Sequence, residues 1–276
     1  MLQKSPDIVK SNALVEAAYR LSLMEQRVIL ACLSRIDPRA SISADVAYPI
    51  PLDELVKLAG KLEKTAYVQA KEAALKLYRR EIWIRKYPNG GGDIIEVTPG
   101  RWIQAAPFID VKKQISLQFT TLIIPYISGL KKEFTRYNLD DIVKFNSVHS
   151  IRLYELICQY RNVGDRFITL ADLRDMFQIG DKYKVTKDLK RYVLDAALKD
   201  INAKTPLQVS YESIKTGRAI SGFRFLIAEK TTARPAPEKP APAPRPRLTR
   251  AYIERHARPG ESWDDAKARL SDALDR

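Results

Sequence analysis

The predicted secondary-structure elements of this chain occur twice in the same order, and this repetition constrains the fold more than any other feature. In each unit a helix precedes a short strand, a short helix, a longer helix and a two-stranded hairpin. The two short helices begin at Leu52 and Leu170, which are 118 residues apart. A helix-turn-helix followed by a hairpin is the winged-helix arrangement. We therefore predict an α+β fold of two tandem winged-helix domains that form a pseudo-repeat.

Helical periodicity and turn residues define the first unit. Apolar residues that recur every three or four positions indicate helices, and Pro and Gly indicate where helices end. Asp37-Pro38 ends the first helix, and Gly60 ends the second. The elements expected in this unit are a helix over 23–36, a strand over 48–50, helices over 52–59 and 64–79, and strands over 82–84 and 94–97 around a glycine-rich wing at 88–92.

The same signals recur in the second unit and in the segment between the units. Alternating apolar residues predict a strand over 114–120, followed by a short helix over 121–130. The elements expected in the second unit are a helix over 150–160, a strand over 167–169, helices over 170–177 and 185–201, and strands over 208–212 and 222–226 around a hairpin turn at 215–218.

Composition changes sharply after residue 230. Pro there alternates with small or charged residues, which favours an extended linker. Ser262 and Asp265 have the spacing of a capping box and predict a helix over 263–274. The expected divisions are an N-terminal winged-helix domain at 8–110, an interdomain strand and helix segment at 111–141, a C-terminal winged-helix domain at 142–230, a disordered Pro/Ala-rich linker at 231–247 and a short helical tail at 248–276.

The charge of the chain points to a polyanionic partner. The sequence has 47 Lys and Arg against 33 Asp and Glu, which gives a net charge of +14. Release of condensed counterions favours association of such a chain with a phosphate backbone. Double-stranded DNA is therefore the leading candidate, ahead of an anionic membrane surface, and a generally basic protein without such a partner is the third possibility.

Signatures of several other protein classes are missing from the sequence. It has no signal peptide and no long apolar stretch, so we expect a cytoplasmic protein without a membrane partner. Cys32 and Cys158 lie in apolar helical patterns and are expected to be buried thiols. His149 is expected to lie near a helix cap or in the core. We find no P-loop, zinc spacing or metal-binding His pair, and we predict no catalytic residue, no metal site, no cofactor and no enzymatic activity.

The longer helix of the second unit, expected over 185–201, is the best candidate for contact with DNA bases. A helical wheel places on one side Leu189, Val193, Ala196 and Ala197. The other side is basic near its N-terminal end, which is the end that recognition helices insert into the major groove. Arg191 suits a bidentate contact with guanine, whereas lysines suit phosphates. The expected DNA-binding residues of this region are Lys182, Lys184, Lys187, Lys190 and Arg191, and a solvated charged face is the alternative.

Basic residues also lie in the predicted hairpins. The second hairpin is a natural wing, and its expected DNA contacts are Lys215, Arg218 and Arg224. In the first unit the longer helix offers Lys64 and Lys71 as weaker candidates, and the glycine-rich wing carries Arg85 and Lys86. The first unit therefore suits an auxiliary DNA contact or, alternatively, a protein interface.

Three stretches of the sequence resemble a known family. They are Val9–Arg27 (VKSNALVEAAYRLSLMEQR) followed by 31–38 (ACLSRIDP), 130–137 (LKKEFTRY) followed by 150–156 (SIRLYEL), and 190–194 (KRYVL) leading into 200–206 (DINAKTP). Together they resemble the initiator replication proteins of iteron-controlled plasmids. The resemblance covers residues 8–228. Tyr192 stands where this family would have a third basic residue, and Val185 is another departure.

The resemblance implies a role and a set of partners. It implies binding to direct repeats, the iterons, at a plasmid origin, followed by origin opening and recruitment of host replication initiator and helicase proteins. It also implies a monomer–dimer equilibrium through the first domain, with the dimer repressing the chain's own promoter. A winged-helix transcriptional repressor without an initiator role is the alternative, and a nicking or strand-transfer enzyme is the alternative from another class.

Overall fold

The structure is a computed structural model that describes residues 7–60, 63–97, 99–230, 249–250, 253, 256–258 and 260–274. The chain divides into two compact units, residues 1–230 and 231–276. The linker that the sequence predicts at 231–247 lies outside the described residues. Within the first of these compact units, the two winged helices of the prediction share one continuous apolar core.

The first winged helix contains the helices that the periodicity predicts. Ser22 and Glu25 form a capping box at the start of α2, and Gly60, with φ of 62°, ends α3 in a left-handed conformation. The elements up to β4 are β1 (Asp7–Ser11), α1 (Asn12–Val15), β2 (Ala18–Tyr19), α2 (Leu23–Leu33), β3 (Tyr48–Ile50), α3 (Leu52–Ala59), α4 (Glu63–Leu77) and β4 (Glu81–Trp83).

The wing of this first unit differs from the prediction. The expected strand over 94–97 is wrong, since β4 pairs instead with β5 (Pro99–Arg101). Gly100 lets β5 approach closely, because a Cβ there would lie 1.9 Å from a Leu122 methyl carbon. The strand that pairs with β3 is β8 (Gln114–Phe119), which also pairs with β6 (Ile103–Ala105) and β7 (Phe108–Ile109).

The pairing of β8 also bears on the domain boundary that the sequence predicts at residue 110. A boundary at residue 110 would divide the sheet β3–β8–β6, so the expected interdomain segment 111–141 is not a separate connector. After the 3-10 turn η2 (Asp110–Lys112) and β8, the chain continues through α5 (Ile124–Ile127), β9 (Phe134–Asn138) and α6 (Leu139–Val143). β9 pairs with β1, the first strand of the chain, so this segment is part of the first unit.

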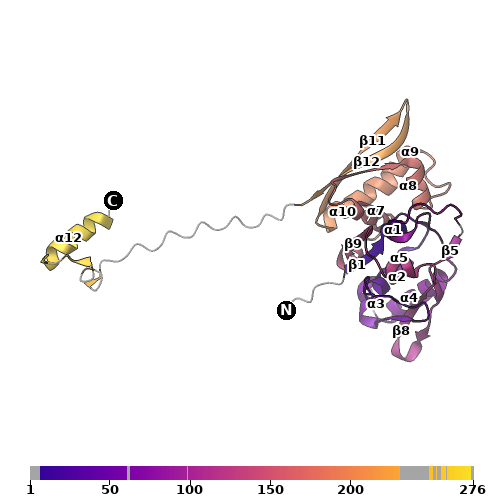
Figure 1. The fold of residues 1–276 in the computed structure, drawn as a ribbon, viewed down its shortest axis with the longest axis horizontal. Helices are drawn as coiled ribbons and strands as arrows, with labels where there is room; N and C mark the ends of the chain where they lie inside the picture. The colour runs from indigo at the N-terminus through magenta and orange to yellow at the C-terminus, as the bar shows by residue number, and fades with distance from the viewer. Residues whose placement is uncertain are drawn as a thin grey trace. The chain divides into compact units, whose positions relative to one another are not determined.

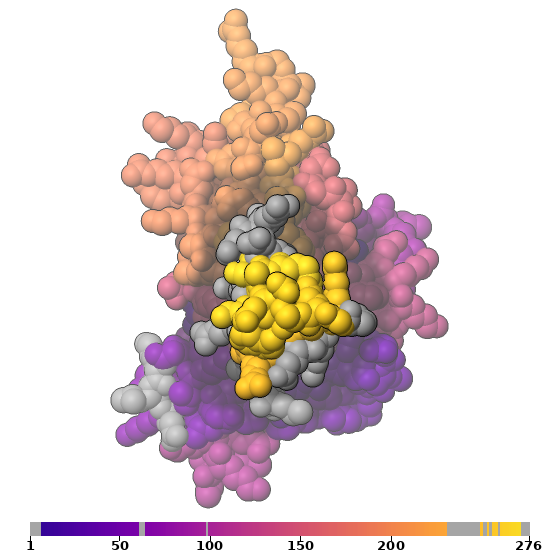
Figure 2. Space-filling view, turned by 90° about the vertical axis from the view of Figure 1, so that its left-hand side faces the viewer, coloured from indigo at the N-terminus to yellow at the C-terminus, as the bar shows by residue number. Residues whose placement is uncertain are grey.

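The second winged helix follows the predicted order closely. Its three-stranded sheet has the order β10–β12–β11, and the long hairpin projects from one end of the body (Figures 1 and 2). Its elements are α7 (Val148–Gln159), β10 (Asp165–Thr169), α8 (Leu170–Met176), α9 (Thr186–Leu189), the π-helical stretch η3 (Lys190–Asp195), α10 (Ala196–Lys204), β11 (Leu207–Thr216) and β12 (Ala219–Glu229).

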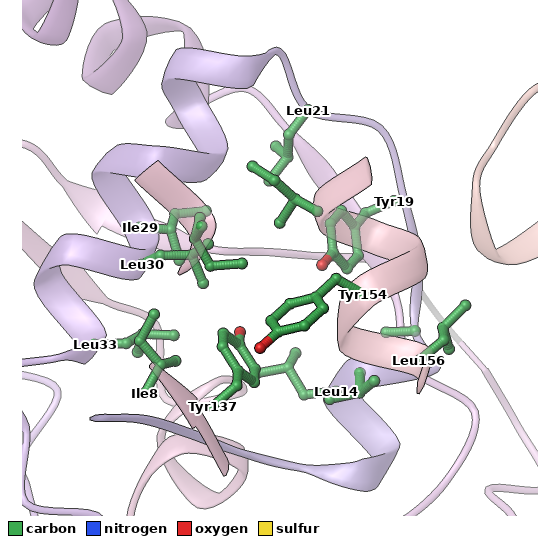
Figure 3. Packing of buried hydrophobic residues seen from close by; sticks show 14 of the residues in the cluster. Ile8, Leu14, Tyr19, Leu21, Ile29, Leu30, Leu33, Tyr137, Tyr154 and Leu156 are labelled. Carbon is green, nitrogen blue, oxygen red and sulfur yellow. The ribbon is translucent and has the colours of Figure 1, made fainter. Parts of the chain in front are cut away.

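The apolar core is built jointly by both units. Figure 3 shows side chains from α2, β9 and α7 meeting around Tyr137 and Tyr154, whose ring centroids are 6.0 Å apart. Ile8 and Leu14, from the N-terminal segment, lie in the same cluster. Burial of such apolar side chains is the main favourable term in folding. The two winged helices therefore fold as parts of one body.

A buried ionic network crosses this shared core. Lys10 of β1 donates from Nζ to Glu155 of α7 at 2.6 Å, and the two side chains are 1% and 0% exposed. Arg152 lies 3.2 Å from the same carboxylate and also donates to the carbonyls of Val15 and Ala17. Tyr137 completes the set by donating its hydroxyl to Glu155. Buried charges persist only when they are paired in this way.

The network holds Glu155 in its ionised form. Burial alone would raise the pKa of this carboxyl, but Lys10 and Arg152 hold it below its ordinary value of 4.5. A carboxyl whose pKa falls on folding stabilises the fold fully above that ordinary value, and this stabilisation is lost as the pH falls below it.

Replacement of Lys10 with Met should lower the free energy of unfolding by about 3–5 kcal/mol, because it leaves a buried carboxylate without its nearest cation. Urea unfolding at pH 7 measures the loss. The penalty should shrink in acid, where Glu155 is protonated. The double variant Lys10→Met/Glu155→Gln is the control and should lose less than the single variant. Unfolding of Lys10→Met at the urea concentration of the parent chain would contradict this account.

The C-terminal unit contains the predicted helix α12 (Trp263–Leu274). Ser262 accepts from the backbone N–H of Asp265 at 3.2 Å, as the capping-box spacing predicts. Arg269 pairs with Glu261 at 2.8 Å, and these contacts lower the pKa of Glu261 to about 2. Ile253, Ala266 and Leu270 form its small core. The helix prediction for this tail is confirmed.

Candidate nucleic-acid interface

The turn between α8 and α9 is fixed by one arginine. Arg174 of α8 donates to the carbonyls of Tyr183, Lys182 and Gly180 at 2.9, 3.0 and 3.2 Å. Gly180 and Tyr183 have φ of 56° and 53°, so the chain turns sharply here before the long helix begins. Hydrogen bonds from a charged donor are stronger than those between neutral groups. The start of the long helix is therefore held in place relative to α8.

The long helix buries one side and presents basic residues on the other. Leu189 and Val193 are buried, whereas Lys187 and Arg191 are exposed and form no ion pair with any described residue. Lys190 lies 5.6 Å from the ring centre of Tyr211. These positions agree with the two sides that the helical wheel predicts.

The π-helical stretch alters the buried side further along. The wheel predicts Ala196 on the buried side, but Ala196 is exposed and Leu194 is buried instead. A π-turn holds an extra residue, so it rotates every following side chain relative to an ideal α-helix. The prediction for Ala196 is wrong for this reason.

Two aromatic side chains, those of Tyr183 and Tyr192, lie close to Arg191. Tyr192 is 52% exposed, and its ring stacks on that of Tyr183 with centroids 6.0 Å apart. The guanidinium of Arg191 lies 5.3 Å from the centre of the Tyr192 ring. Tyr192 therefore extends the basic surface with an aromatic platform.

The remaining basic residues of the second unit lie in different settings. Lys182 precedes the helix and is exposed, while Lys184 makes an exposed pair with Asp181 at 3.3 Å. Lys215 and Arg218 flank the hairpin tip and are exposed. Arg224 lies away from the tip, in the middle of β12, and pairs with Asp165 at 3.6 Å. The tip therefore presents two of the three expected cations.

In the first unit most of the candidate cations are already engaged. Lys71 of α4 pairs with Asp110 at 2.8 Å and lies 3.8 Å from the centre of the Phe108 ring. Arg85 pairs with Asp175 of α8 at 2.7 Å, and Lys86 pairs with Glu16 at 2.8 Å. Lys64, in the first turn of α4, is exposed and forms no ion pair with a described residue. The basic residues expected on the first wing, Arg85 and Lys86, are therefore paired with acidic residues elsewhere in the protein.

Sequence reasoning missed two cations close to the start of the long helix. Arg20 and Arg80 come from the first unit, yet they line one pocket together with Lys182 and His149. No sequence spacing links these positions, because the packing of the two units brings them together. His149 is half-buried beside Phe177, just after the N-cap residue Ser147, as the sequence predicts.

Metal-binding clusters and membrane-spanning helices are both absent from the described residues. No group of three or more His, Cys, Asp or Glu side chains is arranged to hold a metal ion there. None of the described helices has the length and apolarity needed to span a membrane. Cys32 and Cys158 are both buried and unpaired, and burial raises the pKa of the Cys158 thiol to about 12.

Comparison with protein families agrees with this architecture. Residues 7–158 match the model described as "Initiator Replication protein, WH1", and residues 169–227 match "Initiator Rep protein, WH2". The chain belongs to the initiator replication protein family. This assignment confirms the two winged-helix domains and the resemblance that the sequence motifs indicate.

Similar proteins from Escherichia coli include a replication initiation protein and the PI protein. The chain is 27% identical over 261 residues to the PI protein and 25% identical over 227 residues to a replication initiation protein. These alignments cover 81% and 80% of this chain, and 83% and 69% of the relatives. An uncharacterized 27.6 kDa protein is 30% identical over 240 residues, which cover 83% of this chain and 97% of that protein.

A solved structure shares the fold of this initiator. The crystal structure of Pi initiator protein in complex with iteron DNA superposes with a TM-score of 0.67 at 24% identity. It covers 83% of this chain and 100% of the other. The tandem arrangement of winged helices is therefore common to both proteins.

Replacement of Arg174 with Met should loosen the turn before the long helix. Each lost bond from a charged donor contributes about 1.5–3 kcal/mol, so amide hydrogen exchange over 178–184 should speed up at least about tenfold. Mass spectrometry of peptides from this segment measures the change. Arg224→Met, which breaks an exposed pair elsewhere in the same unit, is the matched control. Unchanged exchange in Arg174→Met would show that the arginine does not hold the turn.

Proposed function

We propose that this chain is a plasmid replication initiator that binds direct repeats at its origin. The observation that carries the proposal is the exposed basic side of the long helix, which begins beside a turn fixed by Arg174. A basic hairpin tip lies in the same winged helix. The similarity to the PI protein and the fold shared with a structure containing iteron DNA support it.

The second winged helix is the sequence reader in this proposal. Its long helix enters the major groove by the N-terminal end, where Arg191 contacts guanine O6 and N7. The lysines at 182, 184, 187 and 190 contact phosphates and fix the register without reading bases. Lys215 and Arg218, at the wing tip, contact the backbone or the minor groove. Arg224 contributes less, because it is paired with Asp165.

The first winged helix has an auxiliary role on DNA. Lys64 is its available contact, while Lys71 would have to leave Asp110 to reach a phosphate. This unit instead provides the surface for self-association. Apolar side chains exposed on α4, directly after it and on the neighbouring β7 are Val68, Leu75, Tyr78, Phe108 and Ile109. Exposed apolar groups gathered in one region are typical of a protein interface.

The remaining steps follow from the initiator role. Monomers bound to the repeats open the origin and recruit the host's replication initiator and helicase proteins in the cytoplasm. The dimer represses the chain's own promoter. DNA binding of this kind needs no catalytic residue, since the work is done by contacts and by deformation of the duplex.

The decisive experiment is a plasmid that carries only the candidate origin and this gene. The proposal expects replication of that plasmid and footprints over direct repeats beside the gene. Binding without replication would instead indicate a transcriptional repressor. Covalent attachment to supercoiled origin DNA, or nicking of it, would indicate a strand-transfer enzyme. Protection of no repeated sequence would refute the proposal.

Two variants of the long helix should distinguish a residue that reads bases from one that contacts phosphates. Arg191→Ala should weaken binding to the repeat by about 1–3 kcal/mol and relax specificity at one base pair. Lys187→Ala should weaken binding to all sequences and reduce the slope of log K against log salt concentration by about 0.9. Fluorescence anisotropy on repeat and random duplexes measures both. Equal losses on both duplexes for both variants would argue against base readout.

Leu75→Glu should favour the monomer, because it places a charge within the apolar surface of α4. Sedimentation velocity over a range of concentrations measures the equilibrium. Val163→Glu changes an exposed apolar residue in the turn before β10 and is the matched control. Dimers of equal affinity in both variants would place the interface elsewhere.

A further inference from the structure

A pocket lies where the first winged helix meets the start of the long helix of the second. Its walls come from the segment between β2 and α2, from the end of α4, from the first turn of α7 and from the turn held by Arg174. The polar and charged residues that line it are Tyr19, Arg20, Ser22, Arg80, His149, Arg152, Gln178, Lys182 and Tyr183. Both units therefore contribute to one enclosure.

The charge of this pocket is strongly one-sided. Its lining includes Arg20, Arg80, Arg152 and Lys182, and none of its described lining residues is acidic. Glu25 lies behind Arg80 and pairs with it at 3.0 Å. Arg20 and Lys182 are exposed and form no ion pair with any described residue. Like charges held together in this way favour an anion between them.

A buried donor in the pocket lacks a partner. Arg152 is 3% exposed, and although its terminal nitrogens bond to carbonyls and to Glu155, its Nε–H has no acceptor among the described residues. A buried polar group without a partner is unusual in a folded protein. An oxyanion in the pocket is a natural acceptor for such donors.

His149 lines the same pocket, and its pKa responds to the charges of the cations there. Its ring stacks on Phe177 with centroids 5.8 Å apart. Burial lowers the pKa of His149, and the charges of Lys182 and Arg20 lower it further. Arg152 and Arg80 also line the pocket, and they pair with Glu155 of α7 and Glu25 of α2, while Asp200 of α10 lies next to the α7 residue that follows His149. Asp200 is engaged by the hydroxyl of Ser150 and by Lys204.

We propose that this pocket binds a single backbone phosphate of the DNA, held between Arg20 and Lys182, with His149 taking up a proton as the phosphate enters. The proposal rests on the proposed DNA-binding function. The phosphate cancels the positive field that keeps the imidazole neutral, so the imidazolium becomes favourable. Because Arg20 and Lys182 come from different units, one phosphate contacts both winged helices at their junction.

Proton uptake gives the contact a distinctive signature. A group whose pKa rises on binding makes the complex hold more protons than the free partners, so affinity increases as the pH falls through that range. A DNA phosphodiester does not itself titrate there. The chain has only two histidines, and the other, His256, lies in the C-terminal unit.

The first experiment follows both imidazoles of the full chain by NMR as a function of pH. A duplex carrying the repeat should raise the pKa of His149. Sulfate is an oxyanion that does not titrate in this range. Sodium sulfate should therefore also raise the pKa of His149, relative to sodium chloride of equal ionic strength. Sulfate acting without a matching effect of DNA would identify a free oxyanion as the occupant and overturn the DNA contact.

The second experiment removes the cations that hold the phosphate. Arg20→Gln and Lys182→Gln should each abolish the rise in the pKa of His149 and reduce the salt slope of DNA binding by about 0.9. Arg39→Gln removes an equal charge from an exposed loop of the first unit and is the control. His149→Gln should remove the increase in DNA affinity at low pH.

These outcomes separate the pocket from the function on which it rests. DNA binding that leaves His149 unaffected overturns the pocket and preserves the proposed function. A sulfate response together with no binding to any repeat overturns the proposed function and supports an anion site of another kind. Equal salt slopes for Arg20→Gln, Arg39→Gln and the parent chain overturn the phosphate contact.

Discussion

The ion pair between Lys10 and Glu155 is buried within the core that the two winged helices share. It joins the first strand of the chain to α7, and Arg152 extends it to the carbonyls beside β2. Each of these charges would be costly to bury alone, so the network requires that all its members meet in one geometry. Two independent domains on a flexible joint would separate Glu155 from Lys10, and this buried network could not form.

Everything that touches DNA in our proposal depends on that arrangement. Around the network, Arg85 binds Asp175 of α8, and Glu16 binds Arg166 at 2.9 Å. These pairs tie the first unit to the helix whose Arg174 holds the turn before the recognition helix. The phosphate pocket, with Arg20 on one side and Lys182 on the other, exists only while the units stay docked. A fixed spacing between two reading modules suits binding to repeats of fixed length.

The sequence predicted the second winged helix better than the first. Its short helix, long helix and hairpin follow strong local signals, and the basic side of the long helix lies where the wheel places it. The first wing could not be predicted, because glycines at 90–92 indicate a turn without indicating that β4 pairs with β5 or that β3 pairs with β8. That pairing is a long-range choice, made by buried Leu117 and Phe119 of β8.

The candidate site shows the same division between local and long-range information. Lys187 and Arg191 follow from helical periodicity, which is local. Arg20, Arg80 and the partners of Lys71 and Arg85 follow from tertiary packing, which no spacing records. The rotation at Leu194 comes from a π-turn, which ordinary helical periodicity does not encode. In the packed structure Lys71, Arg85 and Lys86 are all engaged in ion pairs.

Tethered DNA cleavage shows whether a rigid body places two winged helices on each repeat. The β11–β12 hairpin and β8 lie at opposite ends of the body (Figure 1), and the natural cysteines are buried, so an iron chelate can be attached at Thr216→Cys in β11 or at Val111→Cys, just before β8. We predict cleavage from both positions, separated in every repeat by one constant offset of about 10 base pairs or a whole multiple. An offset that varies between repeats, or cleavage from only one position, would contradict the account.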